Sequence, residues 1–294
     1  MNALSFGEIL WDIIEGRPHL GGAPLNFAAH VVKCGGRSAM VSAVGADHLG
    51  NDALAEVKNL NVDVSMVRQL EKYKTGTVDI FLEDGQPDYT IHEGVAFDYI
   101  PSPESARLLA GDYDVFYCGT LAQRNETSQE TLRQLLRTLS FRHIFYDINL
   151  RKQFYTKEII SWSLQQASIF KVNEYEAEVL SQMYFDGILP TGEFAAKIAS
   201  KFEVEIVIIT AAEKGCYVYY RGEFIEVPGI SVQVVDAIGA GDSFSAAFLT
   251  RYFLSGNVLE AARVANRVGA FVASSRGAIP EYPTDLIAQI HAKE

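Results

Sequence analysis

The residues best suited to chemistry are Gly239, Ala240, Gly241 and Asp242, which follow an apolar run and precede a pattern typical of a helix. Two glycines around one alanine leave little side-chain bulk, so backbone N–H groups can approach a ligand closely. A helix start adds unpaired N–H donors and a partial positive charge, which favour an anion. A carboxylate beside a bound phosphate repels it unless that carboxylate faces a hydroxyl about to lose its proton. The stretch therefore fits phosphoryl transfer to an alcohol, with Asp242 as the base.

A simpler interpretation of the same residues is structural. Gly-rich turns commonly lead into helices, and an aspartate at a helix start is more often a cap than a base. The stretch is not a P-loop, because no G-x-x-x-x-G-K-[ST] occurs in the chain. It is not a dinucleotide fingerprint either, because Phe244 stands where the third glycine belongs. The surrounding elements must decide between catalysis and capping.

Composition excludes several classes of protein. The chain has 294 residues, 48% of them hydrophobic and 21% charged, which fits one globular domain. A formal net charge of −12 excludes a broad surface for nucleic acid or anionic membranes. Three scattered cysteines form neither a zinc spacing nor a disulfide framework. No signal peptide or membrane-spanning run is visible, so we expect a cytoplasmic protein.

From residue 114 onward, apolar strands alternate with helical patterns. Such alternation predicts a mostly parallel sheet with helices on both faces, a three-layer α/β/α fold, and ligands gather at the carboxyl ends of its strands. Polar clusters follow three successive strands, at 119–124, 147–151 and 173–176. We expect these clusters and the Asp242 stretch to line a single crevice.

Two segments near the N-terminus suggest a smaller sheet. Alternating runs at 77–83 and 89–93 flank Asp84-Gly85, which is a hairpin signal. Together with the first strand's extension, they predict a small β-sheet built from about 9–20 and 75–98. No repeat or linker is visible, so residues 1–294 are predicted to form one domain that carries this sheet.

A glycine pair ending at Gly22 leads into a predicted helix. Asn26 lies one turn inside and faces back toward the glycines, so its amide can bond hydroxyls above them. Asp12 stands among apolar residues, where a carboxylate needs a polar ligand unless its strand is an exposed edge. Phe97 can stack on a sugar face, although core packing is the commoner explanation for an aromatic. Taken singly, each residue also has such a structural explanation.

The residues 236–242 resemble the D-T-x-G-A-G-D signature of the ribokinase-like (PfkB) carbohydrate kinases, with Ala237 in place of threonine. The segment 21–26 is similar to the family's G-G-x-x-x-N motif, and the resemblance extends from 7 to 280. It implies that Asp242 is the base and that the amides of 239–241 hold the transferring phosphoryl group. It also implies that Asp12, Gly22 and Asn26 bind sugar hydroxyls, under a small sheet that acts as a lid.

Other segments of the resemblance concern the phosphates and the nucleotide. Asn149 and Arg151 stand in a D-x-N-x-R segment like that of bacterial fructokinases, near the junction of sugar and phosphate. Asn173-x-x-Glu176 matches a motif whose glutamate organises water-bound Mg²⁺, although a glutamate there also complements the helix dipole. The predicted nucleotide-binding residues are Asn173, Thr210, Gly215, Gly241 and Asn266. Asp236 and Gly277 are predicted beside a monovalent cation such as K⁺.

We therefore predict an ATP-dependent, Mg²⁺-requiring sugar kinase, most like a fructokinase. The predicted hairpin carries five carboxylates and no Lys or Arg between 77 and 93, which favours a neutral sugar over a phosphosugar. Kinases for 2-keto-3-deoxygluconate, which Arg124 or Arg151 would meet at its carboxylate, for ribose or for nucleosides remain alternatives. So does a nonreacting sugar-binding regulator. The sequence leaves open the sugar, the nucleotide, the cation requirement given Ala237, and whether the chain is a monomer or a homodimer.

Overall fold

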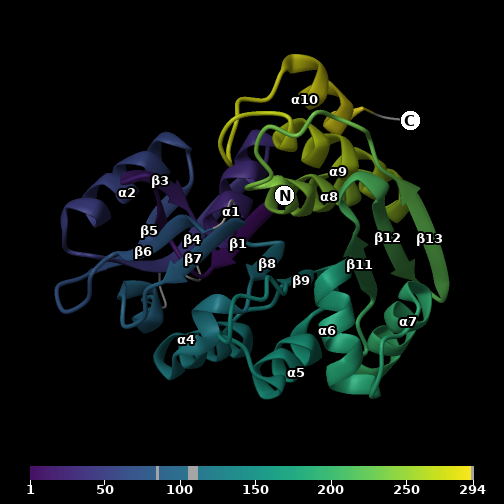
Figure 1. The fold of residues 1–294 in the computed structure, drawn as a ribbon, viewed down its shortest axis with the longest axis horizontal. Coiled ribbons are helices and arrows are strands. Elements are labelled where there is room, and N and C mark those ends of the chain that lie inside the picture. Colours follow the sequence, from purple (N-terminus) through teal and green to yellow (C-terminus); the bar gives the residue numbers. More distant parts are fainter. Residues whose placement is uncertain (84–85, 105–111, 293–294) are drawn as a thin grey trace.

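The computed structural model describes residues 1–83, 86–104 and 112–292, and a large sheet runs through the middle of the molecule (Figure 1). Its strand order is β13-β12-β11-β10-β9-β8-β1-β4-β5. Neighbouring strands are parallel except in the β11–β12 and β12–β13 pairs. The strands are β1 (Asn2–Phe6), β4 (Arg37–Gly45), β5 (Asp63–Leu70), β8 (Val115–Cys118), β9 (His143–Asp147), β10 (Ile169–Asn173), β11 (Ile206–Thr210), β12 (Gly215–Tyr220) and β13 (Glu223–Pro228).

Helices cover both faces of this sheet. Helices α4 to α7 lie on one face, and α1, α8, α9 and α10 lie on the other, as Figure 1 shows. The α-helices are α1 (Ala23–Lys33), α2 (His48–Asn59), α4 (Glu126–Thr138), α5 (Lys157–Gln166), α6 (Glu174–Phe185), α7 (Thr191–Phe202), α8 (Ala240–Ser255), α9 (Val258–Ala273) and α10 (Thr284–His291). Short 3-10 turns are η1 (Ala96–Tyr99), η2 (Leu121–Arg124) and η3 (Ala212–Lys214). The predicted three-layer α/β/α fold is confirmed.

The central strands are apolar on both faces because both faces are covered. In β1, Leu4 and Phe6 pack into the core beside α4 to α7, whereas Ala3 packs into the core beside α8 and α9. This double burial explains why the strands are continuous apolar runs without alternation. It also leaves the strand ends as the places where polar side chains can reach a ligand.

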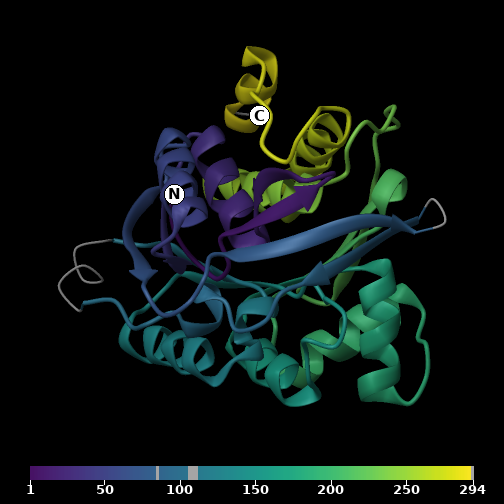
Figure 2. The same cartoon turned by 60° about the vertical axis from the view of Figure 1, so that its left-hand side comes forward.

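A second sheet stands in front of the main one, where Figure 2 shows its long strands β6 and β7. Its order is β3-β2-β6-β7, with β2 at Leu10–Ile14, β3 at Arg17–Gly21, β6 at Gly76–Glu83 and β7 at Gln86–Ile91. Strands β2 and β6 are parallel, and the other pairs are antiparallel. The small sheet predicted from 9–20 and 75–98 is therefore present, while its predicted turn at Asp84-Gly85 lies outside the described residues.

Some elements have no counterpart in the sequence prediction. Strand β5 forms an edge of the large sheet, and its mixed exposure hides the period of a strand. Helix α6 begins where the sequence analysis placed Glu176 near a helix start, whereas α7, which follows α6 directly, was not anticipated. Within the described part of the chain, no helix has the length and apolar character needed to cross a membrane.

Candidate active site

Two cavities meet at the start of α8. The first, here called the lid cavity, has a volume of about 390 Å³ and lies between the small sheet and α8. The second, here called the apolar cavity, has a volume of about 340 Å³ and lies between α8, α9 and the ends of β10 and β11. Ala237 and Gly241 line both. The single crevice predicted from the sequence is thus two adjoining cavities, divided by the turn that carries the candidate chemistry.

The lid cavity collects most of the predicted sugar-binding residues. Those that line it are Asp12, Gly22, Asn26, Asn149 and Arg151, and the predicted base Asp242 lines it as well. They come from the small sheet, the start of α1, the loop after β9 and the start of α8. Segments more than 200 residues apart in sequence therefore converge on one cavity.

Asp242 is buried at the floor of the lid cavity, with 8% of its surface exposed. Asn26 donates from Nδ2 to Asp242 Oδ2 at 2.9 Å. Burial raises the pKa of Asp242 to about 7, and the negative charge of Asp147 adds to this rise. Asn26, Lys171 and Arg151 oppose it by favouring the charged form. A carboxylate with a pKa near neutrality is suited to accept a proton during a reaction.

The turn before α8 depends on Gly239, which has a φ of 80°. A Cβ at this position would overlap the carbonyl oxygen of Ala278 and come within 2.9 Å of its Cα. In the described part of the chain, the N–H groups of Gly239, Gly241 and Asp242 have no hydrogen-bond partner, whereas the Ala240 N–H donates to the Ala237 carbonyl at 3.3 Å. Three unpaired donors at a helix start suit an anion.

The other helix start at the lid cavity also requires glycine. Gly22 is the N-cap of α1 and has a φ of 116°. A Cβ at Gly22 would lie 2.5 Å from the carbonyl oxygen of Glu8. The close approach brings Asn26, one turn later, into reach of Asp242. A side chain at Gly22 would therefore displace the helix that holds Asn26.

The carboxylates of the lid cavity are unusually basic. Burial raises the pKa of Asp12 to about 6, against the opposing charges of Arg151 and His19. Burial also raises the pKa of Glu8, which lines the same cavity and has an Oε2 without a hydrogen-bond partner among the described residues. Glu8 was not a predicted site residue, although its place among apolar residues marked it. Arg151 is the cation whose charge opposes the pKa rises of Glu8, Asp12 and Asp242.

Asn149 also lines this cavity, in a backbone conformation with a φ of 44°. Asparagine tolerates the left-handed region better than most residues with a side chain. In the loop after β9, Asn149 and Arg151 both line the cavity.

The prediction that Phe97 contacts a sugar is wrong. Phe97 is completely buried, does not line the lid cavity and packs in the core. A Cβ on Gly76 would lie 2.6 Å from its ring, and the Arg124 guanidinium lies 4.8 Å from the ring centroid. The ring is thus enclosed by β6 and by Arg124, which in turn donates to Asp98 at 2.6 Å. The Arg124 side chain therefore has a packing and ion-pairing role beneath the small sheet.

A buried ion pair lies beneath the turn before α8. Lys171 on β10 contacts both carboxylate oxygens of Asp147, at 2.9 and 2.8 Å. Tyr117 and Ser245 each donate a hydroxyl hydrogen bond to Asp147 Oδ2 at 3.1 Å. A Cβ on Gly241 would lie 3.4 Å from Lys171 Nζ, so the pair supports the turn from below. Sequence reasoning placed Asp147 at a strand end but missed Lys171, whose signal was a lone charge inside an apolar strand.

The five predicted nucleotide-binding residues all line the apolar cavity, together with small residues of α8 and α9. Asn266 is nearly buried and donates from Nδ2 to the carbonyls of Val227 and Pro228, at 3.2 and 3.1 Å. Its amide therefore holds the end of β13 against α9. A narrow, largely apolar cavity that ends at an anion-binding turn matches a flat ring joined to phosphates.

Ala212, which also lines the apolar cavity, has a φ of 48°. This is the left-handed backbone conformation, which glycine adopts freely and which is strained for a residue with a Cβ. A side chain in this region costs about 1–2 kcal/mol. Ala212 thus carries strain.

We expect Ala212→Gly to raise the free energy of unfolding by about 0.5–1 kcal/mol. Relief of the left-handed strain exceeds the added flexibility of the unfolded chain, which costs roughly 0.4–1 kcal/mol. Urea unfolding measures the change. Ala211→Gly is the control, because Ala211 has a φ of −131° and its replacement is expected to destabilise. If Ala212→Gly and Ala211→Gly lower the free energy of unfolding equally, Ala212 is not strained.

Glu176 is buried at the start of α6 and forms a reciprocal cap with Asn173. Its Oε2 accepts from the Asn173 N–H at 3.0 Å, and its Oε1 accepts from the Leu150 N–H at 2.8 Å. Burial raises its pKa. Among the described residues, no cluster of three His, Cys, Asp or Glu side chains is suited to hold a metal. Glu176 therefore fits a Mg²⁺ ion whose direct ligands are mainly water and phosphate oxygens.

Asp236 and Gly277, predicted beside a monovalent cation, lie next to each other. The Gly277 N–H donates to Asp236 Oδ2 at 3.3 Å, and the Ile238 N–H donates to Asp236 Oδ1 at 3.0 Å. Both residues line a separate hollow under β3. The carboxylate therefore ties two loops together behind the turn that precedes α8.

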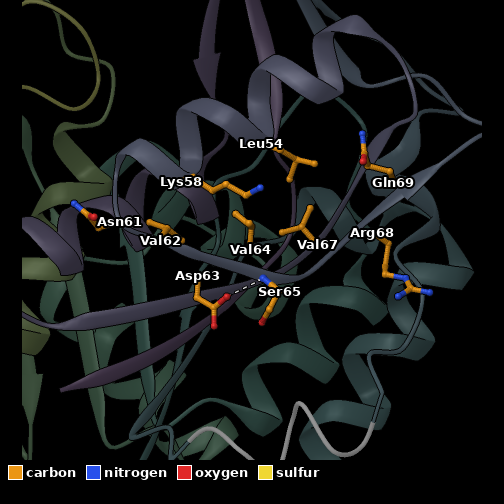
Figure 3. Close-up of a pocket in the computed structure, with 10 residues that line it drawn as sticks. All are labelled: Leu54, Lys58, Asn61, Val62, Asp63, Val64, Ser65, Val67, Arg68 and Gln69. Carbon is orange, nitrogen blue, oxygen red and sulfur yellow. Dashed lines mark hydrogen bonds between the residues drawn. The ribbon is translucent and has the colours of Figure 1, made fainter.

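A larger hollow lies elsewhere among the described residues. It has a volume of about 840 Å³ between α2 and β5, and Figure 3 shows the side chains that line it, among them Lys58, Asp63 and Arg68. None of the residues predicted from the sequence lines it. We therefore assign the candidate active site to the two smaller cavities, where the perturbed carboxylates and the helix start converge.

The chain is similar in sequence and in fold to known carbohydrate kinases. The model of the pfkB family carbohydrate kinases matches residues 6–285. A fructokinase of Escherichia coli is 27% identical, over 94% of this chain and 94% of that protein. An uncharacterized sugar kinase from Pyrococcus horikoshii, solved in complex with ATP, has a TM-score of 0.82 at 24% identity, covering 95% of this chain and 94% of that one. A fructokinase from Vibrio cholerae, solved with fructose, ADP and calcium, has a TM-score of 0.83 at 20% identity and covers 99% of both chains.

Proposed function

The chain belongs to the PfkB family of carbohydrate kinases, and on this premise we propose that it transfers the γ-phosphoryl group of ATP to a primary hydroxyl of D-fructose. The observation that carries the proposal is the position of Asp242. Its buried carboxylate lies at the floor of the lid cavity, beside a turn whose unpaired N–H groups suit an anion. The sugar would occupy the lid cavity, and the nucleotide would occupy the apolar cavity.

Asp242 acts as the base in this proposal. The sugar hydroxyl loses its proton to the carboxylate while its oxygen forms a bond to the γ-phosphorus and the bond from phosphorus to ADP breaks. Asn26 orients the carboxylate through the 2.9 Å hydrogen bond to Oδ2, which leaves Oδ1 for the hydroxyl. The pKa of about 7 permits proton uptake near neutral pH.

The turn before α8 stabilises the charge on the transferring group. The N–H groups of Gly239, Gly241 and Asp242 have no other hydrogen-bond partner in the parts of the chain described. Preorganised donors in a partly buried site favour a transition state whose charge develops beside them. Mg²⁺, when bound, neutralises phosphate charge, and Glu176 contributes negative charge from the α6 side through water.

The choice of a neutral sugar rests on charge balance in the lid cavity. Arg151 is the cation among its lining residues, and its charge opposes the pKa rises of three carboxylates, Glu8, Asp12 and Asp242. Its positive charge is therefore already balanced. An acidic sugar or a phosphosugar would bring a further negative charge among those carboxylates, which is unfavourable. The names of the E. coli and V. cholerae relatives support fructose among neutral sugars.

A sugar panel tests the substrate. ADP release is measured by a coupled assay with fructose, ribose, 2-keto-3-deoxygluconate and fructose 6-phosphate, and we expect the highest kcat/KM with fructose. Asp12→Ala is expected to lower kcat/KM for fructose by roughly 5- to 150-fold, because a buried hydroxyl loses its partner. If 2-keto-3-deoxygluconate or fructose 6-phosphate has a higher kcat/KM than fructose, fructose is refuted as the substrate, but the kinase activity is not. ATP turnover with none of the sugars refutes the proposed activity.

We expect Glu176→Gln to raise the Mg²⁺ concentration needed for half-maximal activity. The substitution removes one negative charge near the metal at almost constant shape. Mg²⁺ titrations of the parent and the variant at saturating ATP measure the effect. Glu174→Gln is the control, because Glu174 is a neighbouring carboxylate whose charge pairs with Lys214 at 3.1 Å. An unchanged titration for Glu176→Gln would leave Glu176 with its capping role alone.

A further inference from the structure

His30 and Tyr282 form a buried hydrogen-bonded pair behind the turn that precedes α8. His30 lies on α1 and has no exposed surface. The Tyr282 hydroxyl is 2.7 Å from His30 Nδ1, and the Ala278 carbonyl oxygen is 2.9 Å from His30 Nε2. The side chains also stack, with ring centroids 5.7 Å apart. The imidazole thus links α1 to the segment before α10.

Only one arrangement of protons on a neutral His30 imidazole satisfies these contacts. A carbonyl oxygen can only accept, so His30 Nε2 must carry the hydrogen. The Nδ1 atom of a neutral imidazole is then an acceptor, and the Tyr282 hydroxyl donates to it. Burial lowers the pKa of His30 to about 4 and raises that of Tyr282, so both groups are neutral at physiological pH. The pair therefore has a fixed direction, from Tyr282 through His30 to Ala278.

The carbonyl that His30 holds is the one that packs on Gly239. A Cβ on Gly239 would overlap the Ala278 oxygen and lie 3.0 Å from its carbonyl carbon. Gly239 is the N-cap of α8 and begins the turn that lines the lid cavity and carries the unpaired N–H groups. Asn26, which precedes His30 by one turn of α1, donates to Asp242 in the first turn of α8. Helix α1 is therefore linked to the start of α8 at two points, directly at Asp242 and through Ala278 at Gly239.

We propose that His30 and Tyr282 are positioning residues that hold the Ala278 carbonyl against Gly239 and so keep the N–H groups of the turn aimed at the transferring phosphoryl group. This inference rests on the proposed function. The pair touches neither cavity, so its effect is on the shape of the anion-binding turn and not on the binding of sugar or nucleotide. Loss of the pair therefore reduces the stabilisation of the transition state more than the binding of the substrates in the ground state.

Tyr282→Phe is the main test, because it removes one hydroxyl and keeps the ring. We expect kcat to fall roughly five- to tenfold, which corresponds to one neutral hydrogen bond, with KM for the sugar within about twofold of the parent. Calorimetry supplies a readout that needs no turnover. The affinity for ADP is expected to stay unchanged, and the affinity for ADP with aluminium fluoride and sugar, which mimics the transferring group, is expected to fall by a factor similar to that in kcat.

Two further variants separate positioning from general stability. His30→Gln keeps an N–H donor for the Ala278 carbonyl and is expected to retain more kcat than His30→Phe, which has none. Tyr184→Phe is the matched control, because it removes a hydroxyl that lies 2.8 Å from Ser161 in the α5–α6 layer. It is expected to leave kcat unchanged. All variants are assayed well below their melting temperatures.

The outcomes are distinct. An active parent whose kcat survives Tyr282→Phe overturns this inference and leaves the proposed function standing. A fall in kcat matched by Tyr184→Phe, or one accompanied by an equal loss of ADP affinity, also overturns it. A parent that phosphorylates none of the sugars overturns the proposed function and this inference with it.

Discussion

Replacement of Asp242 by asparagine is expected to lower kcat by about 10²–10⁴-fold while sugar affinity changes little. The side chain keeps its shape and its neighbour Asn26, but an amide accepts no proton from the sugar hydroxyl. The base acts on a proton that leaves only during transfer, so its loss appears in kcat and not in ground-state binding. Coupled ADP release measures kcat, and titration calorimetry with the sugar measures binding.

The pH profile of the parent provides an independent measurement of the same group. The reactive form of Asp242 is deprotonated, and its pKa is raised to about 7, so kcat/KM is expected to fall as the pH drops below about 7. An ordinary aspartate would keep its activity to below pH 5. The residual activity of Asp242→Asn should lack the inflection near pH 7, so that the acid limb moves down toward the pKa of about 6 of Asp12.

Asp285→Asn is the control for a capping role. Asp285 is an exposed carboxylate in the first turn of α10, as Asp242 is a buried one in the first turn of α8. A carboxylate that only complements a helix dipole is worth about 0.3–1 kcal/mol of stability and nothing to turnover. Turnover of Asp242→Asn within about tenfold of the parent would make Asp242 a cap of the same kind and refute its role as the base.

The residues that the sequence located well are those whose signal is local. A Gly-x-Gly turn before a helix marks the start of α8, and polar residues directly after apolar strands mark the edge of a parallel sheet. Because parallel strands end at the same edge, Asn149 and Arg151 reach the lid cavity that also contains Asp242. The direct bond from Asn26 to Asp242, across 216 residues, follows from the meeting of two helix starts at that edge.

The residues that the sequence did not locate depend on tertiary contacts. Only the packing of β6 and Arg124 around the ring of Phe97 shows that this residue belongs to the core. His30 looks like an ordinary residue of a helix, because its partners at 278 and 282 lie near the other end of the chain. The division between two cavities is likewise set by where the turn at Gly239 rests, which no local pattern encodes.

Lys171 is the residue whose signal was present but unused, and Lys171→Met is expected to lower the free energy of unfolding by about 3–5 kcal/mol. Lys171 and Asp147 are 5% and 1% exposed, and they lie 2.8 Å apart. Removal of the lysine leaves the Asp147 charge buried without its counter-ion. A lysine inside a strand of otherwise apolar residues requires such a partner, because lysine is almost never fully buried unpaired. Urea unfolding measures the loss.

Two controls identify the cause of this loss. Lys197→Met breaks an exposed pair with Glu193, in which both side chains are 48% exposed, and is expected to cost less than about 1 kcal/mol. The double variant Lys171→Met with Asp147→Asn removes both charges and keeps an acceptor for Tyr117 and Ser245, so it should recover much of the stability that Lys171→Met loses. If Lys171→Met costs no more than Lys197→Met, or if the double variant is less stable than Lys171→Met, the unpaired charge is not the cause. The turn before α8 would then rest on packing alone.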